Sequence, residues 1–77
     1  MEVQKIQNRL KRIEGQIRGI ENMVETLRSA DEIIIQLSAV RSAVDSLLIN
    51  FVDDEINQAD KERLLELKAI VKRMIKS

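Results

Sequence analysis

One segment of this chain, from about residue 30 to residue 58, restricts its possible folds more than any other. Its apolar residues recur at the spacing of a helix face, and further isoleucines widen that face until the segment is apolar almost all round. At 1.5 Å per residue, about 29 residues give a helix roughly 43 Å long, whereas a compact protein of this chain length is only about 30 Å across. The helix therefore extends beyond its own monomer, and we expect a second subunit to cover it. The apolar positions are Ile33, Ile34, Leu37, Val40, Val44, Leu47, Leu48, Phe51 and Val52, widened by Ile35, Ile49 and Ile56.

Two amphipathic segments flank the long one, each with a single apolar stripe. Ser29 followed by Glu32 matches a capping box at the start of the long segment, and Asp60 is a suitable N-cap for the last one. Proline is absent, and 44% of the residues are hydrophobic. We predict an all-α domain over residues 1–77 with helices at about 3–27, 30–58 and 61–76, whose first two helices form an antiparallel four-helix-bundle dimer with a second copy. The flanking stripes are Ile6, Leu10, Ile13, Ile17, Ile20, Val24 and Leu27, then Leu64, Leu67, Ile70, Val71 and Met74.

Both glycines of the chain interrupt the first helix, where each costs about 0.5–1 kcal/mol relative to alanine. At about 100° per residue, Gly15 and Gly19 fall opposite the apolar stripe. A basic surface with bare backbone at its centre indicates close approach of an anionic backbone. Two plainer interpretations stay open: a solvated helix face, and a tight helix–helix crossing of the kind that small residues make in membranes. The bases on this side are Lys5, Lys11, Arg12 and Arg18, and the acids Glu14, Glu21 and Glu25 fall at its edge, outside it.

The formal net charge of zero hides an uneven distribution. Residues 1–20 contain five bases and two acids, residues 21–60 two bases and nine acids, and residues 61–77 six bases and two acids. Nucleic acids recognise a local basic surface, so overall neutrality does not exclude such a partner. No segment reaches the ~18–20 apolar residues of a membrane span, and the first residues do not resemble a signal peptide, so we expect a cytoplasmic protein without membrane contact.

Residues that carry out chemistry are scarce in this sequence. Cysteine and histidine are absent, and no nucleophile stands beside a base. The run Asp53-Asp54-Glu55 offers oxygen ligands for a hard cation, but consecutive helical residues do not converge on one point. We expect these acids to be solvated or paired with bases of the third helix. The three methionines are scattered and are better explained as core filling than as copper ligands.

Three stretches of the sequence resemble the signature of one bacterial family. They are Arg9-Leu10-Lys11-Arg12-Ile13-Glu14-Gly15-Gln16-Ile17-Arg18-Gly19-Ile20, Met23-Val24-Glu25 and Gln36-Leu37-Ser38-Ala39-Val40-Arg41-Ser42-Ala43-Val44. The family is that of the copper-sensing operon repressors (CsoR/RcnR type), which also contains sensors of nickel and cobalt, formaldehyde and persulfide. The resemblance covers about residues 5–59 without a gap. It implies an all-α, disc-shaped dimer of dimers that binds operator DNA without a helix-turn-helix and releases it when an effector binds.

The resemblance breaks at the effector site. Copper sensors of the family bind Cu(I) through a cysteine near the start of the second helix of one subunit, and through a histidine and a cysteine near the end of that helix in another. Laid on this sequence without gaps, these positions are Ala30, Glu55 and Ala59. Cu(I) prefers thiolate and imidazole ligands, which this chain lacks, and persulfide and formaldehyde sensing need the same first cysteine. We therefore expect no metal, no cofactor, and no response to copper, nickel, persulfide or formaldehyde.

The resemblance and the basic helix together predict a DNA-binding transcriptional repressor that has lost the usual sensing site. An alternative is a helical partner that does not bind DNA and forms mixed oligomers with a related sensor. A remote alternative is a small all-helical enzyme of the chorismate mutase type, for which the sequence offers no catalytic constellation. The residues expected to contact DNA are Lys5, Arg9, Lys11, Arg12, Gly15, Arg18 and Gly19, with Arg41 nearby.

Overall fold

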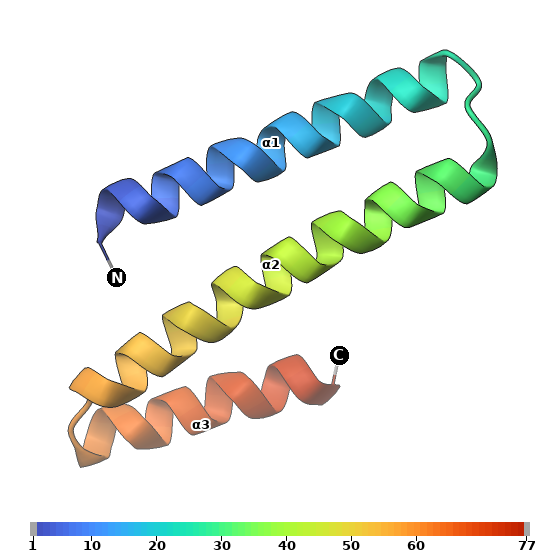
Figure 1. The fold of residues 1–77 in the computed structure, drawn as a ribbon. Coiled ribbons are helices and arrows are strands. Elements are labelled where there is room, and N and C mark those ends of the chain that lie inside the picture. The colour runs from blue at the N-terminus through green and yellow to red at the C-terminus, as the bar shows by residue number, and fades with distance from the viewer. Residues whose placement is uncertain (1, 77) are drawn as a thin grey trace.

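The computed structural model describes residues 2–76, and every regular element among them is a helix. The helices are α1 (Val3–Glu25), α2 (Ala30–Gln58) and α3 (Lys61–Lys76). α1 and α2 form an antiparallel hairpin, and α3 folds back along the C-terminal half of α2 on the side away from α1 (Figure 1). The predicted all-α fold with three helices is confirmed.

Side-chain caps start the second and third helices as the sequence predicts. The Ser29 hydroxyl accepts a hydrogen bond of 3.3 Å from the backbone N–H of Glu32. The Asp60 carboxylate accepts one of 2.8 Å from the backbone N–H of Arg63. Each bond satisfies one of the amide groups that a helix N-terminus leaves unpaired. The capping box is only half formed, because the carboxylate of Glu32 accepts a hydrogen bond from the Arg28 side chain instead.

α1 ends at Glu25, two residues before the predicted end, in a turn that ordinarily uses glycine. The backbone N–H of Leu27 donates to the carbonyl of Val24, and that of Arg28 donates to the carbonyl of Met23. These two hydrogen bonds together form a Schellman motif, in which the residue just after the helix cap adopts a left-handed conformation. That residue is Leu27, with φ of 55°. Leu27 therefore lies outside the apolar stripe to which its spacing assigned it, and its side chain is 89% exposed.

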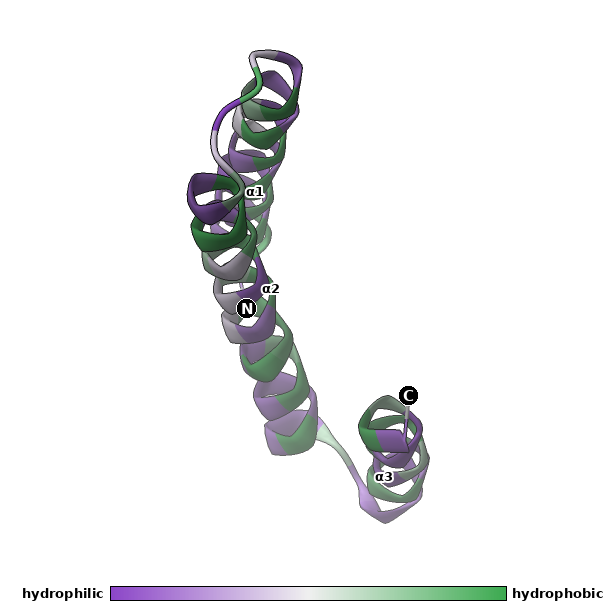
Figure 2. Ribbon diagram, turned by 90° about the vertical axis from the view of Figure 1, so that its right-hand side faces the viewer, coloured by the Kyte–Doolittle hydropathy of each residue, from purple (hydrophilic) through white to green (hydrophobic). Residues whose placement is uncertain are grey.

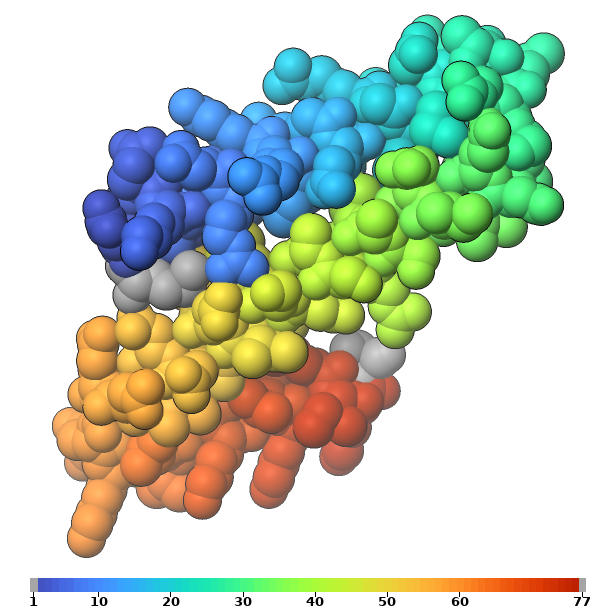
Figure 3. All heavy atoms as spheres, viewed as in Figure 1, coloured from blue at the N-terminus to red at the C-terminus, as the bar shows by residue number. Residues whose placement is uncertain are grey.

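The three helices form a thin, elongated layer with little interior. The chain measures 51 × 31 × 13 Å, and its radius of gyration is 16.2 Å, against about 11–12 Å for a compact protein of this length. In the space-filling view the helices stand as separate ridges with little mutual cover (Figure 3). Among residues 2–76 the buried apolar side chains are Ile13, Ile20, Leu47 and Leu67.

Much of the predicted core is consequently open to solvent. Hydrophobic residues recur along the whole length of α2 (Figure 2). Two apolar grooves result, one of about 370 Å³ between α1 and α2 and one of about 310 Å³ between α2 and α3. Within the described residues, no helix combines the length and the apolar character that a membrane crossing requires.

Candidate nucleic-acid interface

Gly15 and Gly19 form an open notch on α1. A Cβ atom built at either glycine meets no heavy atom within 4 Å among the described residues. The notch therefore faces away from α2, as the helical spacing predicts. A tight helix crossing at these glycines is not made within this chain. What the notch offers is exposed backbone that another molecule can approach closely.

The charges of α1 run against its macrodipole. A helix N-terminus favours acids and a C-terminus favours bases, by about 0.3–1 kcal/mol per charge. α1 has no acid in its first turn and no base in its last turn. Glu2 is the N-cap residue, but Lys5 stands in the first turn and Glu25 is the last helical residue. Apart from Glu2, the charges at the two ends of α1 are those that destabilise a helix, so helix stability does not explain Lys5 and Glu25.

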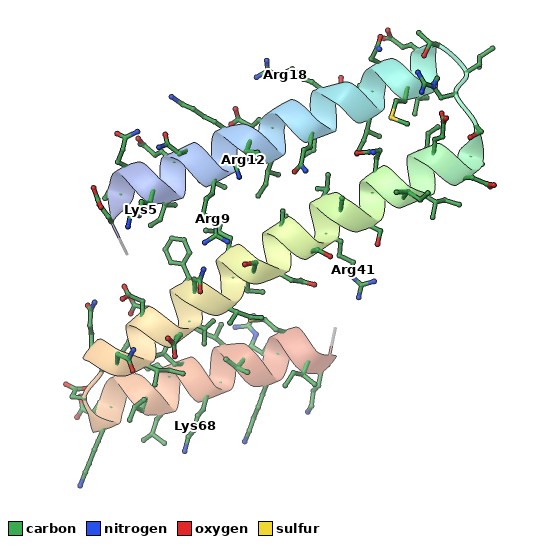
Figure 4. The ribbon with its side chains drawn as sticks, viewed as in Figure 1. Lys5, Arg9, Arg12, Arg18, Arg41 and Lys68 are labelled. Carbon is green, nitrogen blue, oxygen red and sulfur yellow. The ribbon has the colours of Figure 1, made fainter. Side chains whose placement is uncertain are left out.

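The bases of α1 fall into two groups, of which the inner bases lie beside α2. These are Lys5, Arg9 and Arg12, spaced so that they share one stripe of the helix. Arg9 is half-buried and points from α1 towards α2 (Figure 4). Its Nη2 atom donates a hydrogen bond of 3.0 Å to the hydroxyl oxygen of Ser46 on α2. Arg9 thus fixes one part of the basic surface to the second helix.

The outer bases, Lys11 and Arg18, lie on the far side of α1 from α2. Figure 4 shows Arg18 pointing away from the other helices. Its Nη2 atom lies 3.8 Å from Oε2 of Glu14, and both side chains are largely exposed. The predicted basic side is therefore less free of acids than its spacing suggested, because Glu14 reaches Arg18 from the edge. An exposed pair at this distance contributes at most about 1 kcal/mol, so an incoming phosphate can displace it.

Arg41 does not join the bases of α1 within one chain. Its side chain extends from α2 on the side away from α1 (Figure 4). On its own helix its stripe neighbours at four and three residues are Leu37 and Val44, which are both exposed. Within one chain, Arg41 therefore stands apart from the predicted DNA surface on α1.

Of the three positions that carry effector ligands in the family, one lies far from the other two in this chain. Ala30 is the first residue of α2 and Ala59 follows its last, so about 38 Å of helix separates Ala30 from Glu55. Oε2 of Glu55 lies 3.5 Å from Nη2 of Arg63 on α3, which also contacts Glu66 at 3.0 Å. The expectation that acids at the end of α2 pair with bases of the third helix is confirmed for Glu55. No group of three or more acids, histidines or cysteines suited to a metal ion occurs among the described residues.

One further ion pair stands beside Ala30, where the turn after α1 leads into α2. Nε of Arg28 donates a hydrogen bond of 2.8 Å to Oε2 of Glu32. This bond and the attraction between the charges raise the pKa of Arg28 and lower the pKa of Glu32. Both groups stay charged near neutral pH, so this turn presents a paired guanidinium and carboxylate rather than a ligand set for a soft metal.

The sequence alone does not predict two contacts of this site, those of Ser46 and Arg63. Ser46 carries no signal of its own, because its contact with Arg9 depends on how α1 and α2 align. Arg63 forms the ion pair with Glu55, and the sequence identifies Arg63 only as one of several bases in α3. The spacing of Glu14 and Arg18, at four residues, was the one available sign of their ion pair.

Several known proteins resemble this chain in sequence and in fold. A family model described as metal-sensitive transcriptional repressor matches residues 2–77. The copper-sensing transcriptional repressor CsoR of Bacillus subtilis (strain 168) is 40% identical over 85 residues, which cover 99% of this chain and 84% of that protein. The copper-sensing transcriptional repressor RicR of Mycobacterium tuberculosis (strain ATCC 25618 / H37Rv) is 31% identical over 80 residues, covering 90% and 83%. The solved structure of the nickel-responsive transcriptional regulator InrS matches with a TM-score of 0.85 and 38% identity, over 95% of this chain and 92% of that one.

Proposed function

The chain belongs to the metal-sensitive transcriptional repressor family, and from this premise we propose that it represses transcription by holding operator DNA against the basic side of α1. The family consists of repressors rather than enzymes, so the small-enzyme alternative falls. The observation that carries the proposal is the open notch at Gly15 and Gly19, which stands among the exposed bases Lys11, Arg12 and Arg18. Phosphate contacts require bases that approach closely, and the bare backbone permits that approach.

We propose a homotetramer built as a dimer of dimers. Two separate apolar grooves support it: one between α1 and α2 around Ile17 and Leu37, the other between α2 and α3 around Val52 and Val71. They lie on different helix pairs, so covering both requires two kinds of contact between copies. Two isologous contacts close into a tetramer, whereas one gives a dimer. A folded monomer at micromolar concentration in analytical ultracentrifugation would contradict this assembly.

Loss of the sensing site is the third part of the proposal. Alanine has no donor atom, and Glu55 provides one hard carboxylate that already faces Arg63. A single ligand cannot draw two subunits together around a metal. The protein then acts in the cytoplasm, where operator DNA is, as a constitutive repressor or under control of a small molecule. Such a molecule would bind in the altered pocket that Ala30 of one chain forms with Glu55 and Ala59 of another.

The mixed-oligomer alternative has a specific structural consequence. Because Ala30 and Glu55 stand at opposite ends of α2, each effector site of the family type takes its residues from two chains. A dimer of this chain with a cysteine-bearing relative would lack part of both sites. Such a relative keeps a complete site only if the mixing occurs between whole dimers.

A salt titration of DNA binding tests the proposed function. The wild-type protein is titrated into labelled duplex from its own promoter and into a scrambled duplex, at several salt concentrations. We expect tighter binding to the promoter, and log affinity that falls with log salt at about −0.9 per phosphate contact. Absence of binding at low salt, or an affinity independent of salt, would refute contact between the basic side of α1 and DNA.

A further inference from the structure

A small recess lies between α1 and α2, at the inner bases. Arg9 and Arg12 of α1 and Ser46 of α2 border it, and Ile13 and Ala43 complete its lining. Its volume of about 170 Å³ is enough for several water molecules, and so for one tetrahedral oxyanion. Ala43 matters here because a larger side chain at that position of α2 would fill the space.

The polar side chains that line the recess are hydrogen-bond donors, with no carboxylate among them. A guanidinium carries five N–H donors, and the 3.0 Å bond to Ser46 uses one of those of Arg9. Because Ser46 accepts that bond, its own O–H remains available as a donor. Neither Arg9 nor Arg12 forms an ion pair with any carboxylate that the structure describes.

The bases are also crowded in a way that an anion would relieve. Lys5 stands four residues before Arg9, and Arg12 stands three residues after Arg9. Three positive charges are therefore neighbours on one stripe of α1. Like charges at this spacing destabilise a helix, and Arg9 is in addition half-buried beside α2. Ser46 holds the Arg9 guanidinium in this position before any ligand arrives.

We propose that the recess bordered by Arg9, Arg12 and Ser46 binds one phosphate group, from a DNA phosphodiester or from a free phosphate, with Ser46 as its positioning residue. This deepens the proposed function and depends on it only for the DNA source. The site joins α1 to α2 through the ligand, so α2 takes part in anion binding although its one base, Arg41, points elsewhere. Free phosphate and DNA compete for the same donors.

Four variants on α2 test the site. Ser46→Ala removes the hydroxyl, and Ser46→Glu places a carboxylate inside the recess, where it pairs with the two arginines. Ser38→Ala and Ser38→Glu make the same changes at another exposed serine of α2, two turns away. Ser46 and Ser38 are both exposed, so we expect each variant to keep its helices, which circular dichroism checks.

Two measurements separate the sources of phosphate. Inorganic phosphate is titrated against sulfate-free protein while the side-chain N–H resonances of the arginines are followed by NMR. Promoter DNA binding is followed by fluorescence anisotropy at constant ionic strength. We expect Ser46→Ala to weaken phosphate-group binding about tenfold, the amount that one charge-assisted hydrogen bond contributes, and Ser46→Glu to abolish it. We expect no effect of Ser38→Ala, and for Ser38→Glu, whose carboxylate is three residues from Arg41, at most a partial loss of DNA affinity.

Each outcome decides between distinct possibilities. Saturable shifts of the Arg9 and Arg12 resonances that vanish in Ser46→Glu establish a site for free phosphate, even if wild-type DNA binding, and with it the proposed function, fails. A tenfold loss of DNA affinity in Ser46→Ala without saturable phosphate shifts assigns the site to a DNA phosphodiester. If both Ser46 variants match their Ser38 controls in both measurements, the inference is overturned.

Discussion

Replacing both glycines of α1 by alanine should stabilise the protein while weakening its binding to DNA. The added methyl groups meet no heavy atom within 4 Å, so they introduce no clash in the chain. Alanine is more favourable than glycine in a helix interior by about 0.5–1 kcal/mol, which gives about 1–2 kcal/mol for Gly15→Ala and Gly19→Ala together. At about 4–8 °C per kcal/mol for a domain of this size, Tm should rise by roughly 10 °C.

The effect on DNA has the opposite sign because the methyl groups stand at the centre of the basic surface. They hold a phosphate backbone away from Arg12 and Lys11, and we expect at least a tenfold loss of affinity. Gly15→Glu adds bulk and a negative charge there and should abolish binding with helical content intact. Stability is measured by urea unfolding at one fixed protein concentration, because an oligomer's stability depends on concentration. Ser38→Ala on α2 is the control, with a small gain in stability and unchanged DNA affinity.

Two results would refute this reasoning in different ways. If the double alanine variant is less stable than the wild type, the glycines pack against another copy, and the helix-crossing interpretation is correct. If it is more stable but binds DNA as well as the wild type, the notch lies outside the DNA interface. The predicted combination, higher stability with lower affinity, arises only if the bare backbone serves the ligand.

Three further predictions address the phosphate contacts, the turn after α1 and the effector site. Arg12→Ala should weaken DNA binding and reduce the salt slope by about one unit, whereas Lys68→Ala, which removes a base pointing away from α2 on α3, should change neither; equal losses would indicate unspecific attraction. Leu27→Gly should raise the free energy of unfolding by about 0.5–1 kcal/mol, since a leucine at positive φ costs about 1–2 kcal/mol and the flexibility of glycine offsets only part of that; a loss of stability in urea would show that Leu27 packs against a second copy. Competition with a Cu(I) chelator should show no one-to-one uptake tighter than micromolar, because Ala30 and Ala59 lack donors; such uptake together with release of DNA would mean that the ligand positions are misassigned.

Local signals in the sequence were enough to predict where α2 and α3 begin. Ser29 and Asp60 cap the following helix through bonds that involve neighbouring residues only. The end of α1 was harder, because the left-handed residue of a Schellman turn is normally glycine or asparagine, and leucine at that position gives no sign of the turn. The apolar spacing in the sequence therefore predicts a helix that continues to Leu27, although the helix ends at Glu25.

The candidate site divides along the same line between local and long-range information. Helical spacing fixes the direction of Gly15 and Gly19 relative to the apolar stripe, so their outward position was predictable. The bond from Arg9 to Ser46 joins residues 37 positions apart and depends on the register of the α1–α2 hairpin. Periodicity within either helix says nothing about that register. The position of Arg41 relative to α1 depends on it in the same way, and on how the copies assemble.

The unfavourable local choices in this chain are themselves informative, because they gather on one helix. In α1 the two glycines cost about 0.5–1 kcal/mol each, and Lys5 and Glu25 oppose the helix dipole at its two ends. The residues at the effector positions are, in contrast, locally favourable. Ala30 belongs to the best helix-forming residue type, and the Glu55 carboxylate lies 3.5 Å from the Arg63 guanidinium. Helix stability alone is a sufficient reason for the residues at these effector positions, but it is no reason for the glycines of the notch. A ligand that approaches the notch and attracts bases supplies the missing reason, and a DNA backbone meets both conditions.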